Sequence, residues 1–185
     1  LRRRQRQMCI RDSIIAILNA EPEGVDGRTA IQKLVYFASV KTGIDAGFIP
    51  HYYGPFSPLV AAYLENLISL EFVTEQGRRT IRDRTMYSYF LTQDGKKVAD
   101  LLKKKYPEKF SEVEKVVKKC RKIVHNNIYV LSWAAKVHYI LRQAGKPMTY
   151  REAIEAGKSF GWSLSEEEID SAVKLLLALG LIKKE

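Results

Sequence analysis

The chain has 185 residues, of which 46% are hydrophobic and 28% are charged, and its formal net charge is +10. This length and composition are typical of a soluble globular protein with one or two small domains, and no apolar run approaches the roughly 18 residues that span a bilayer. The excess of positive charge indicates a nucleic acid or another acidic surface as a partner.

The first thirteen residues, LRRRQRQMCIRDS, complicate the interpretation of that charge because they contain five arginines. They are either a basic arm that grips phosphates or translated sequencing-adapter text, which they closely resemble. We expect the second and set residues 1–12 aside as non-native. Residues 13–185 then carry a net charge of +6, and Cys120 is their only cysteine. A lone cysteine excludes an intrachain disulfide, which predicts a cytoplasmic protein.

Residues 13–105 show the periodicities of three helices followed by two strands. Ser13 is the expected cap of the first helix, and Gly43 closes the second. Ser57 before Pro58 begins the third. In chain order the pattern predicts helices over 13–20, 28–43 and 58–70, strands over 71–76 and 85–92, and a hairpin tip over 77–84. This mainly α fold with a small β-hairpin has the order of a winged helix, whose third helix usually enters a DNA groove and whose hairpin is the wing.

The rest of the chain is also expected to be helical. Thr92 or Asp94 begins a helix that ends at Pro107. The next helix, over 108–125, is amphipathic, with lysines on its outer face. Three further helices follow, and the last of them ends like the third helix of the first half, with a small pivot and a short apolar strand. We therefore expect two winged-helix-like units joined by a basic helix, the second being truncated or purely three-helical: 13–105, 106–130 and 131–185.

A family resemblance rests on three segments that occur in order: GRTAIQKLVYFA, HYYGPFSPLVAAYLENLISLEFV and YSYFLTQDGKKVADLL. Over residues 27–105 they resemble the YwgA-like family, whose members are usually labelled winged-helix transcriptional regulators. The helix QKLVYFA and the Gly-Pro turn are also similar, more distantly, to the Panacea (SocA-like) antitoxin domain. The resemblance implies a winged-helix fold and supplies no activity or catalytic residue.

Neither of the two third helices resembles a base-reading helix, because neither is expected to present a positive charge. The expected exposed side chains of the first are Ser57, Ala61, Ala62, Glu65, Asn66 and Ser69. Those of the second are Glu166, Glu167, Glu168 and Asp170, which phosphates would repel.

The positive charge lies at the predicted hairpin tip and between residues 93 and 125, where eleven basic residues face five acidic ones. These side chains either hold a phosphate backbone without reading bases or simply keep the protein surface hydrated. The predicted nucleic-acid contacts are Arg78, Arg79, Arg82 and Arg84 at the tip, supported by Lys103, Lys104, Lys105, Lys118, Lys119 and Lys122.

The segment HYYGPFSPLV, residues 51–60, is the most unusual in the chain. Its aromatic residues form either a stacking platform for bases or a structural turn before the third helix. We favour the structural interpretation, in which Phe56 packs across the helix start while Tyr52 and Tyr53 line a strand against the core. His51 has no carboxylate or thiol near it in sequence that would make a nucleophile pair or a metal site.

Patterns typical of enzymes are missing from the sequence, which contains no Gly-rich phosphate loop, GxSxG or HExxH. His125 and His138 fit no common ligand spacing. Cys120 falls on an apolar stripe, where a core residue is expected. The sequence therefore predicts no enzyme, no cofactor and no metal site.

Two hypotheses follow from the sequence. The first is a cytoplasmic winged-helix protein that acts as a transcriptional regulator and contacts the phosphate backbone of double-stranded DNA. The second is a protein-interaction module, antitoxin-like or an adaptor, that binds a protein partner or a second copy of itself and no DNA. They differ in whether the hairpin and the basic helix form one continuous positive face.

Overall fold

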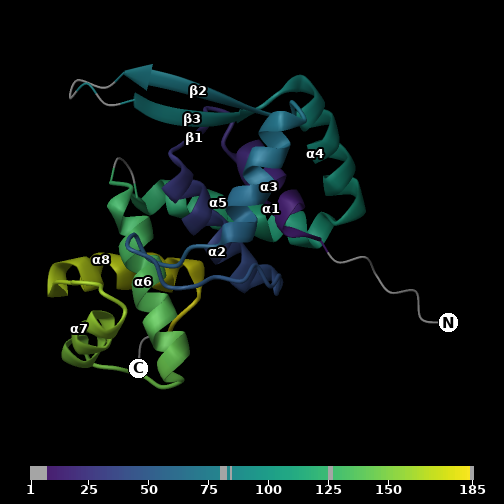
Figure 1. Ribbon diagram of the computed structural model, residues 1–185. Helices are drawn as coiled ribbons and strands as arrows, with labels where there is room; N and C mark the ends of the chain where they lie inside the picture. Colours follow the sequence, from purple (N-terminus) through teal and green to yellow (C-terminus); the bar gives the residue numbers. More distant parts are fainter. Residues whose placement is uncertain (1–7, 80–82, 84, 125–126, 184–185) are drawn as a thin grey trace.

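The computed structural model describes residues 8–79, 83, 85–124 and 127–183. It is mainly helical with one small antiparallel sheet, as the sequence predicts (Figure 1). The elements of this described part are α1 (Ile10–Ala20), β1 (Val25–Asp26), α2 (Arg28–Thr42), α3 (Pro58–Ser69), β2 (Val73–Arg79), β3 (Thr85–Leu91), α4 (Gln93–Lys105), α5 (Pro107–Val124), α6 (Tyr129–Ala144), α7 (Tyr150–Ser159) and α8 (Glu166–Leu179).

The first helix begins earlier than the sequence predicts. Its N-cap is Cys9 rather than Ser13, and the Cys9 amide donates to the Asp12 carboxylate at 3.1 Å. Ser13 is buried within the first turn, where its hydroxyl donates to the Cys9 carbonyl. Met8 and Ile10 are buried in the core. Part of the segment set aside at the sequence level therefore packs against the rest of the protein.

The sheet has the order β1-β3-β2, and both pairs of strands are antiparallel. Strand β1 is too short to give a period-2 pattern, and the sequence did not predict it. Strand β2 runs on to Arg79, which pairs with Thr85, so three residues of the predicted tip, Gly77, Arg78 and Arg79, lie in the strand. Gly24 precedes β1 with φ +88°, and a Cβ there would lie 2.4 Å from the Phe90 ring.

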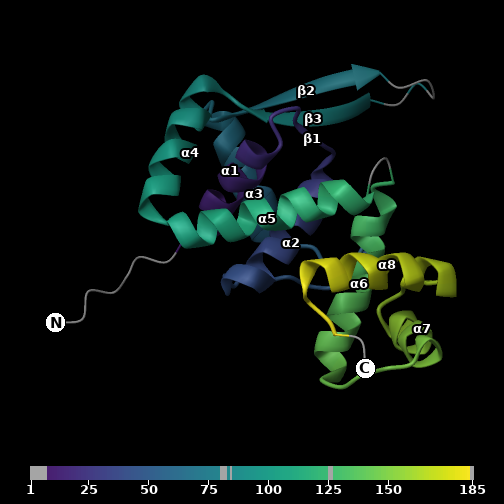
Figure 2. The ribbon, with the colours of Figure 1, turned by 180° about the vertical axis from the view of Figure 1, so that it is seen from behind.

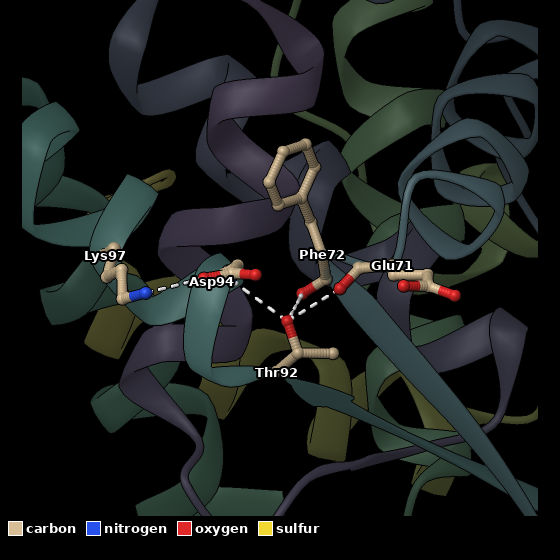
Figure 3. Close-up of polar contacts among 6 residues, drawn as sticks. Glu71, Phe72, Thr92, Asp94 and Lys97 are labelled. Carbon is tan, nitrogen blue, oxygen red and sulfur yellow. Dashed lines mark hydrogen bonds and ion pairs between the residues drawn. The ribbon is translucent and has the colours of Figure 1, made fainter.

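Thr92 joins the end of the sheet to the start of α4 (Figure 3). Its hydroxyl donates to the Glu71 carbonyl at 2.7 Å and accepts from the Gly95 amide at 3.1 Å. Of the two caps predicted from the sequence, Thr92 is the one used, and Asp94 pairs instead with Lys97 at 2.8 Å. The close approach of α4 to Phe72 leaves no room for a side chain at Gly95.

Helix α5 is the central helix of the fold, and Figure 2 shows it lying across α1 and α2. Five residues of its predicted apolar stripe are buried against α1, α2 and α8, namely Phe110, Val113, Val116, Val117 and Cys120, whereas the last two, Ile123 and Val124, are partly buried. Since these side chains pack within the chain, they are not available as a dimer surface. One continuous apolar core runs from α1 to α8.

The C-terminal part is formed by α6, α7 and α8, and α6 packs against both α2 and α8. Thr149 begins α7 with a capping box. Helix α8 ends at Gly180, whose φ of +64° is the left-handed conformation that glycine adopts without strain. Residues 181–183 form no strand, so within the described residues this part is purely helical.

Candidate nucleic-acid interface

The two hairpin arginines that the structure describes are exposed, and both have acidic neighbours. Arg78 pairs with Asp26 of β1 at 3.0 Å, and Arg79 approaches Asp83 at 3.7 Å. Asp26 also accepts a hydrogen bond from the Ser88 hydroxyl, which holds the carboxylate beside the hairpin. Arg82 and Arg84 lie outside the described residues. The positive charge of β2 is therefore partly neutralised within the protein.

Acidic side chains also lie between the hairpin and α5. A hollow of about 450 Å³ is lined by Met86 of β3 on one side and by Arg121 of α5 on the other. Arg121 pairs with Glu23 at 2.9 Å and with Glu21 at 3.4 Å. Burial raises the pKa of Glu21 despite the attraction of Arg121. The hairpin and this half of α5 thus border one hollow, with negative charges at its rim.

The predicted lysines divide into two groups. Lys118, Lys119 and Lys122 are exposed on α5 and form no ion pair with any residue that the structure describes. They are the part of the predicted set that remains free to contact phosphates.

The second group lies at the end of α4, which leads away from the hairpin in both views (Figures 1 and 2). Lys103 pairs with Glu114 at 3.1 Å and its ammonium lies 5.8 Å from the centre of the Phe110 ring. Lys105 lies over Tyr106. Lys104 is exposed. Lys103 and Lys105 thus contact residues at the turn between α4 and α5, and none of the three lysines extends the surface of the hairpin.

Helix α3 lacks the side chains of a base-reading helix, as the sequence predicts. It contains no lysine or arginine. Two of the side chains expected on its outer face lie elsewhere: Ser57 is fully buried as the N-cap, and Ala61 is half-buried. Glu65 is exposed and pairs with Arg28 of α2 at 2.5 Å.

The acidic residues of α8 are used locally. Glu168 closes a capping box with Ser165, and Asp170 accepts a hydrogen bond from the Tyr150 hydroxyl at 2.5 Å. Glu166 and Glu167 are exposed in the first turn, where negative charge stabilises the helix dipole. The first turn of this helix therefore presents negative charge, which phosphates would repel.

The loop before α3 is a structural turn, but its tyrosines do not pack as predicted. Ile49 and Phe56 exchange two backbone hydrogen bonds of 2.9 Å, so the residues between them form a narrow loop. Tyr52 and Tyr53 at its tip are 73% and 54% exposed, so the prediction that they lie against the core is wrong. The Trp162 indole holds the loop from the C-terminal part by donating to the His51 carbonyl at 2.7 Å.

Sequence reasoning missed a buried polar group beneath this loop. The Gln32 side chain donates to the Ser57 carbonyl and accepts from the Ser57 amide, both at 2.9 Å. Lys33 is only 2% exposed, and its ammonium donates to the Pro55 carbonyl at 2.7 Å. Burial, with a smaller contribution from the nearby Lys136, lowers the pKa of Lys33 to about 7. The sequence does contain a signal for this group, because Gln32 and Lys33 are two polar residues with apolar residues directly before and after them in the chain.

A second buried polar pair joins α2 to α6. The Tyr36 hydroxyl and His138 Nδ1 lie 2.8 Å apart. Burial lowers the pKa of His138 to about 4, the Arg142 charge adding to the effect, and burial raises the pKa of Tyr36. This pair is neutral at physiological pH and structural in character. Burial likewise raises the pKa of the Cys120 thiol to about 12, consistent with its predicted place in the core.

Comparisons with known proteins give no further guide to this surface. No family model matches the chain, and a search of curated proteins finds no match. Within the part of the chain that the structure describes, no three potential metal ligands are grouped together. No described helix is both long and apolar enough to cross a bilayer.

Proposed function

We propose that this chain is a winged-helix DNA-binding protein, acting as a transcriptional regulator, that contacts the phosphate backbone with its hairpin. The observation that carries the proposal is the placement of Arg78 and Arg79 at the end of β2, a strand that leads away from α3 and α4 (Figure 1). The element order α1-β1-α2-α3-β2-β3 and the sheet order β1-β3-β2 support the winged-helix assignment. The resemblance of residues 27–105 to the YwgA-like family points to the same fold.

Binding on this proposal depends on charge and not on base sequence. Helix α3 contributes no positive charge, so affinity comes from the hairpin arginines and from Lys118, Lys119 and Lys122. Asp26, Glu21 and Glu23 compete with phosphates for the neighbouring arginines. We therefore expect weak binding that is lost at high salt.

The first test compares residues 8–185 with the whole chain by fluorescence anisotropy of a labelled duplex. Trimming to Met8 removes four arginines but keeps Met8 and Ile10, which are buried in the core. The proposal predicts that residues 8–185 bind the duplex at low salt. Binding by the whole chain alone would assign the affinity to residues 1–7 and would contradict the proposal.

The competing function is a protein-interaction module, either antitoxin-like or an adaptor. It is favoured by an exposed apolar patch at the loop and the start of α3, made of Ile49, Tyr52, Tyr53 and Leu59, which are 49% to 73% exposed. Exposed groups of apolar side chains often mark protein contacts. On this hypothesis, residues 8–185 fail to bind DNA, and replacement of Tyr52 and Tyr53 by serine weakens association with the protein partner or with a second copy.

A further inference from the structure

A cavity of about 230 Å³ lies between α2 and α3, beneath the loop that contains His51 and Tyr53. It is smaller than the roughly 300–1,000 Å³ of drug-sized sites, so only a small molecule fits it. Its walls are mainly apolar and include Ile31, Phe56 and Leu64. Two basic residues of α2, Arg28 and Lys33, also line it. The cavity thus combines an apolar body with positive charge at its edge.

The two basic residues differ in how their charge is balanced. The Arg28 guanidinium donates to the Tyr89 hydroxyl at 2.9 Å and pairs with Glu65 and Glu75 at 2.5 and 3.1 Å. Lys33 forms no ion pair with any described residue. Among the described residues, the Pro55 carbonyl is the only group to which its ammonium donates a hydrogen bond. Fully buried lysines are almost always paired with an acid. Lys33 therefore lacks the counter-ion that Arg28 has.

We propose that this cavity binds a small monocarboxylate with an apolar body, such as an aromatic or branched aliphatic acid, whose carboxylate pairs with the Lys33 ammonium. The apolar walls would hold the body of the ligand, and one buried cation matches one negative charge. A carboxylate bonded to a buried ammonium satisfies the charge that the protein leaves unpaired. The proposal is independent of DNA binding.

The ionisation of Lys33 sets the pH range in which the ligand binds. The charged and titratable groups around it are Arg28 on the same helix, His51 and Tyr53 on the loop, and Lys136 on α6. The Lys136 ammonium is in turn attracted by the Glu168 carboxylate of α8. With the pKa of Lys33 lowered to about 7, the amine is protonated below pH 7 and neutral above it. Since the ligand's carboxylate pairs with the ammonium, the affinity is highest below pH 7. Above pH 7, Lys33 must take up a proton when the ligand binds.

The test is titration calorimetry of residues 8–185 with phenylacetate, and with 2-phenylethanol as the uncharged analogue. At pH 6 we expect phenylacetate to bind at least about tenfold more tightly than 2-phenylethanol, because a hydrogen bond to a charged group is involved. Above pH 7 the affinity for phenylacetate should fall by up to about tenfold per pH unit, while that for 2-phenylethanol stays constant.

Three variants locate the site. Lys33→Met should remove the preference for phenylacetate and its pH dependence, whereas Lys41→Met, at an exposed lysine of the same helix, should change neither. Ala61→Phe, which fills the cavity from α3, should abolish binding of both probes. Circular dichroism checks that each variant is folded. If Lys33→Met does not fold, Ala61→Phe still tests whether the probes bind in this cavity. No binding of phenylacetate at pH 6, or binding unchanged by Ala61→Phe, would overturn the proposal.

Discussion

Lys33 occupies a position that normally suits an apolar side chain, and the protein must either desolvate its charge or neutralise it. Because the pKa of Lys33 is lowered to about 7 in the folded protein, the unfolded chain, with an ordinary lysine, binds more protons between about pH 7 and pH 10. Folding stability must then rise with pH across this range. The cost is greatest below pH 7, where the amine is protonated in both states.

We predict that Lys33→Met removes this pH dependence. The free energy of unfolding of the wild type should gain up to about 1.4 kcal/mol per pH unit between pH 7 and pH 10 relative to the variant. Urea denaturation at four pH values measures the difference, with Lys41→Met as the exposed-lysine control. A difference that is constant with pH would show that Lys33 keeps an ordinary pKa.

His138 gives a second pH-dependent contribution, in a lower range. Its pKa is lowered to about 4, so between pH 6.5 and pH 4 the unfolded chain binds the proton that the folded protein excludes. Stability must fall as the pH is lowered through this window, by up to about 1.4 kcal/mol per unit. We expect His138→Gln, which keeps a polar partner for Tyr36, to flatten that fall. Thermal unfolding between pH 4 and pH 7 measures it, and equal slopes for the two proteins would be contrary to expectation.

For single residues, sequence patterns predicted the structure correctly where the interaction joins near neighbours in the chain. Ser57 followed by Pro58 identifies a helix start because the cap bond to Val60 spans three residues. The exposure of Tyr52 and Tyr53 was not predictable in this way. It depends on the Ile49–Phe56 bridge and on Trp162, which is more than a hundred residues away in the chain.

Among the elements, the junction between β2 and α4 is the most sensitive to added volume. A Cβ at Gly95 would lie 2.1 Å from the Phe72 carbonyl oxygen, which is backbone and cannot rotate aside. We predict that Gly95→Ala destabilises the protein by about 2–4 kcal/mol, since α4 must shift from its cap at Thr92. Chemical denaturation measures it. Lys96→Ala, at the exposed neighbouring position, is the matched control and should have little effect.

The element pattern was predictable where the periodicity is long. Helix α5 was found within one residue at each end because its apolar stripe repeats over five turns. Strand β1 was missed because Val25 and Asp26 are too few to show any period, and their pairing with β3 is a long-range contact. The extension of β2 into the arginine segment was missed because it is imposed by pairing with β3 and not by local propensity.

In the whole molecule, α5 covers apolar surface of both α1 and α2. Residues 8–105 alone would expose that surface, and we predict that they do not fold as an independent unit. Residues 8–185 should show a single cooperative thermal transition, whereas residues 8–105 should show none by circular dichroism. A cooperative transition in the shorter chain would mean that its core is complete without α5.

The sequence predicts the total charge of the molecule but not how that charge is distributed over its surface. The positions of the basic residues can be read from the sequence, but their neutralisation is a property of the fold. Asp26 is more than fifty residues from Arg78, and Glu23 is almost a hundred from Arg121. These ion pairs divide the positive surface, and only the structure shows that α4, which ends in Lys103, Lys104 and Lys105, leads away from the hairpin.

The measurement that tests hairpin binding most directly is the salt dependence of DNA affinity for residues 8–185 with Arg78 and Arg79 both replaced by glutamate. The control, Arg151→Glu with Lys158→Glu, makes the same charge change on α7, away from the sheet. The account predicts that the slope of log K against log salt becomes shallower by about 1.8 in the hairpin variant, or about 0.9 for each lost phosphate contact, and stays unchanged in the control. Equal slopes in the two variants would show that the hairpin does not contact the DNA backbone.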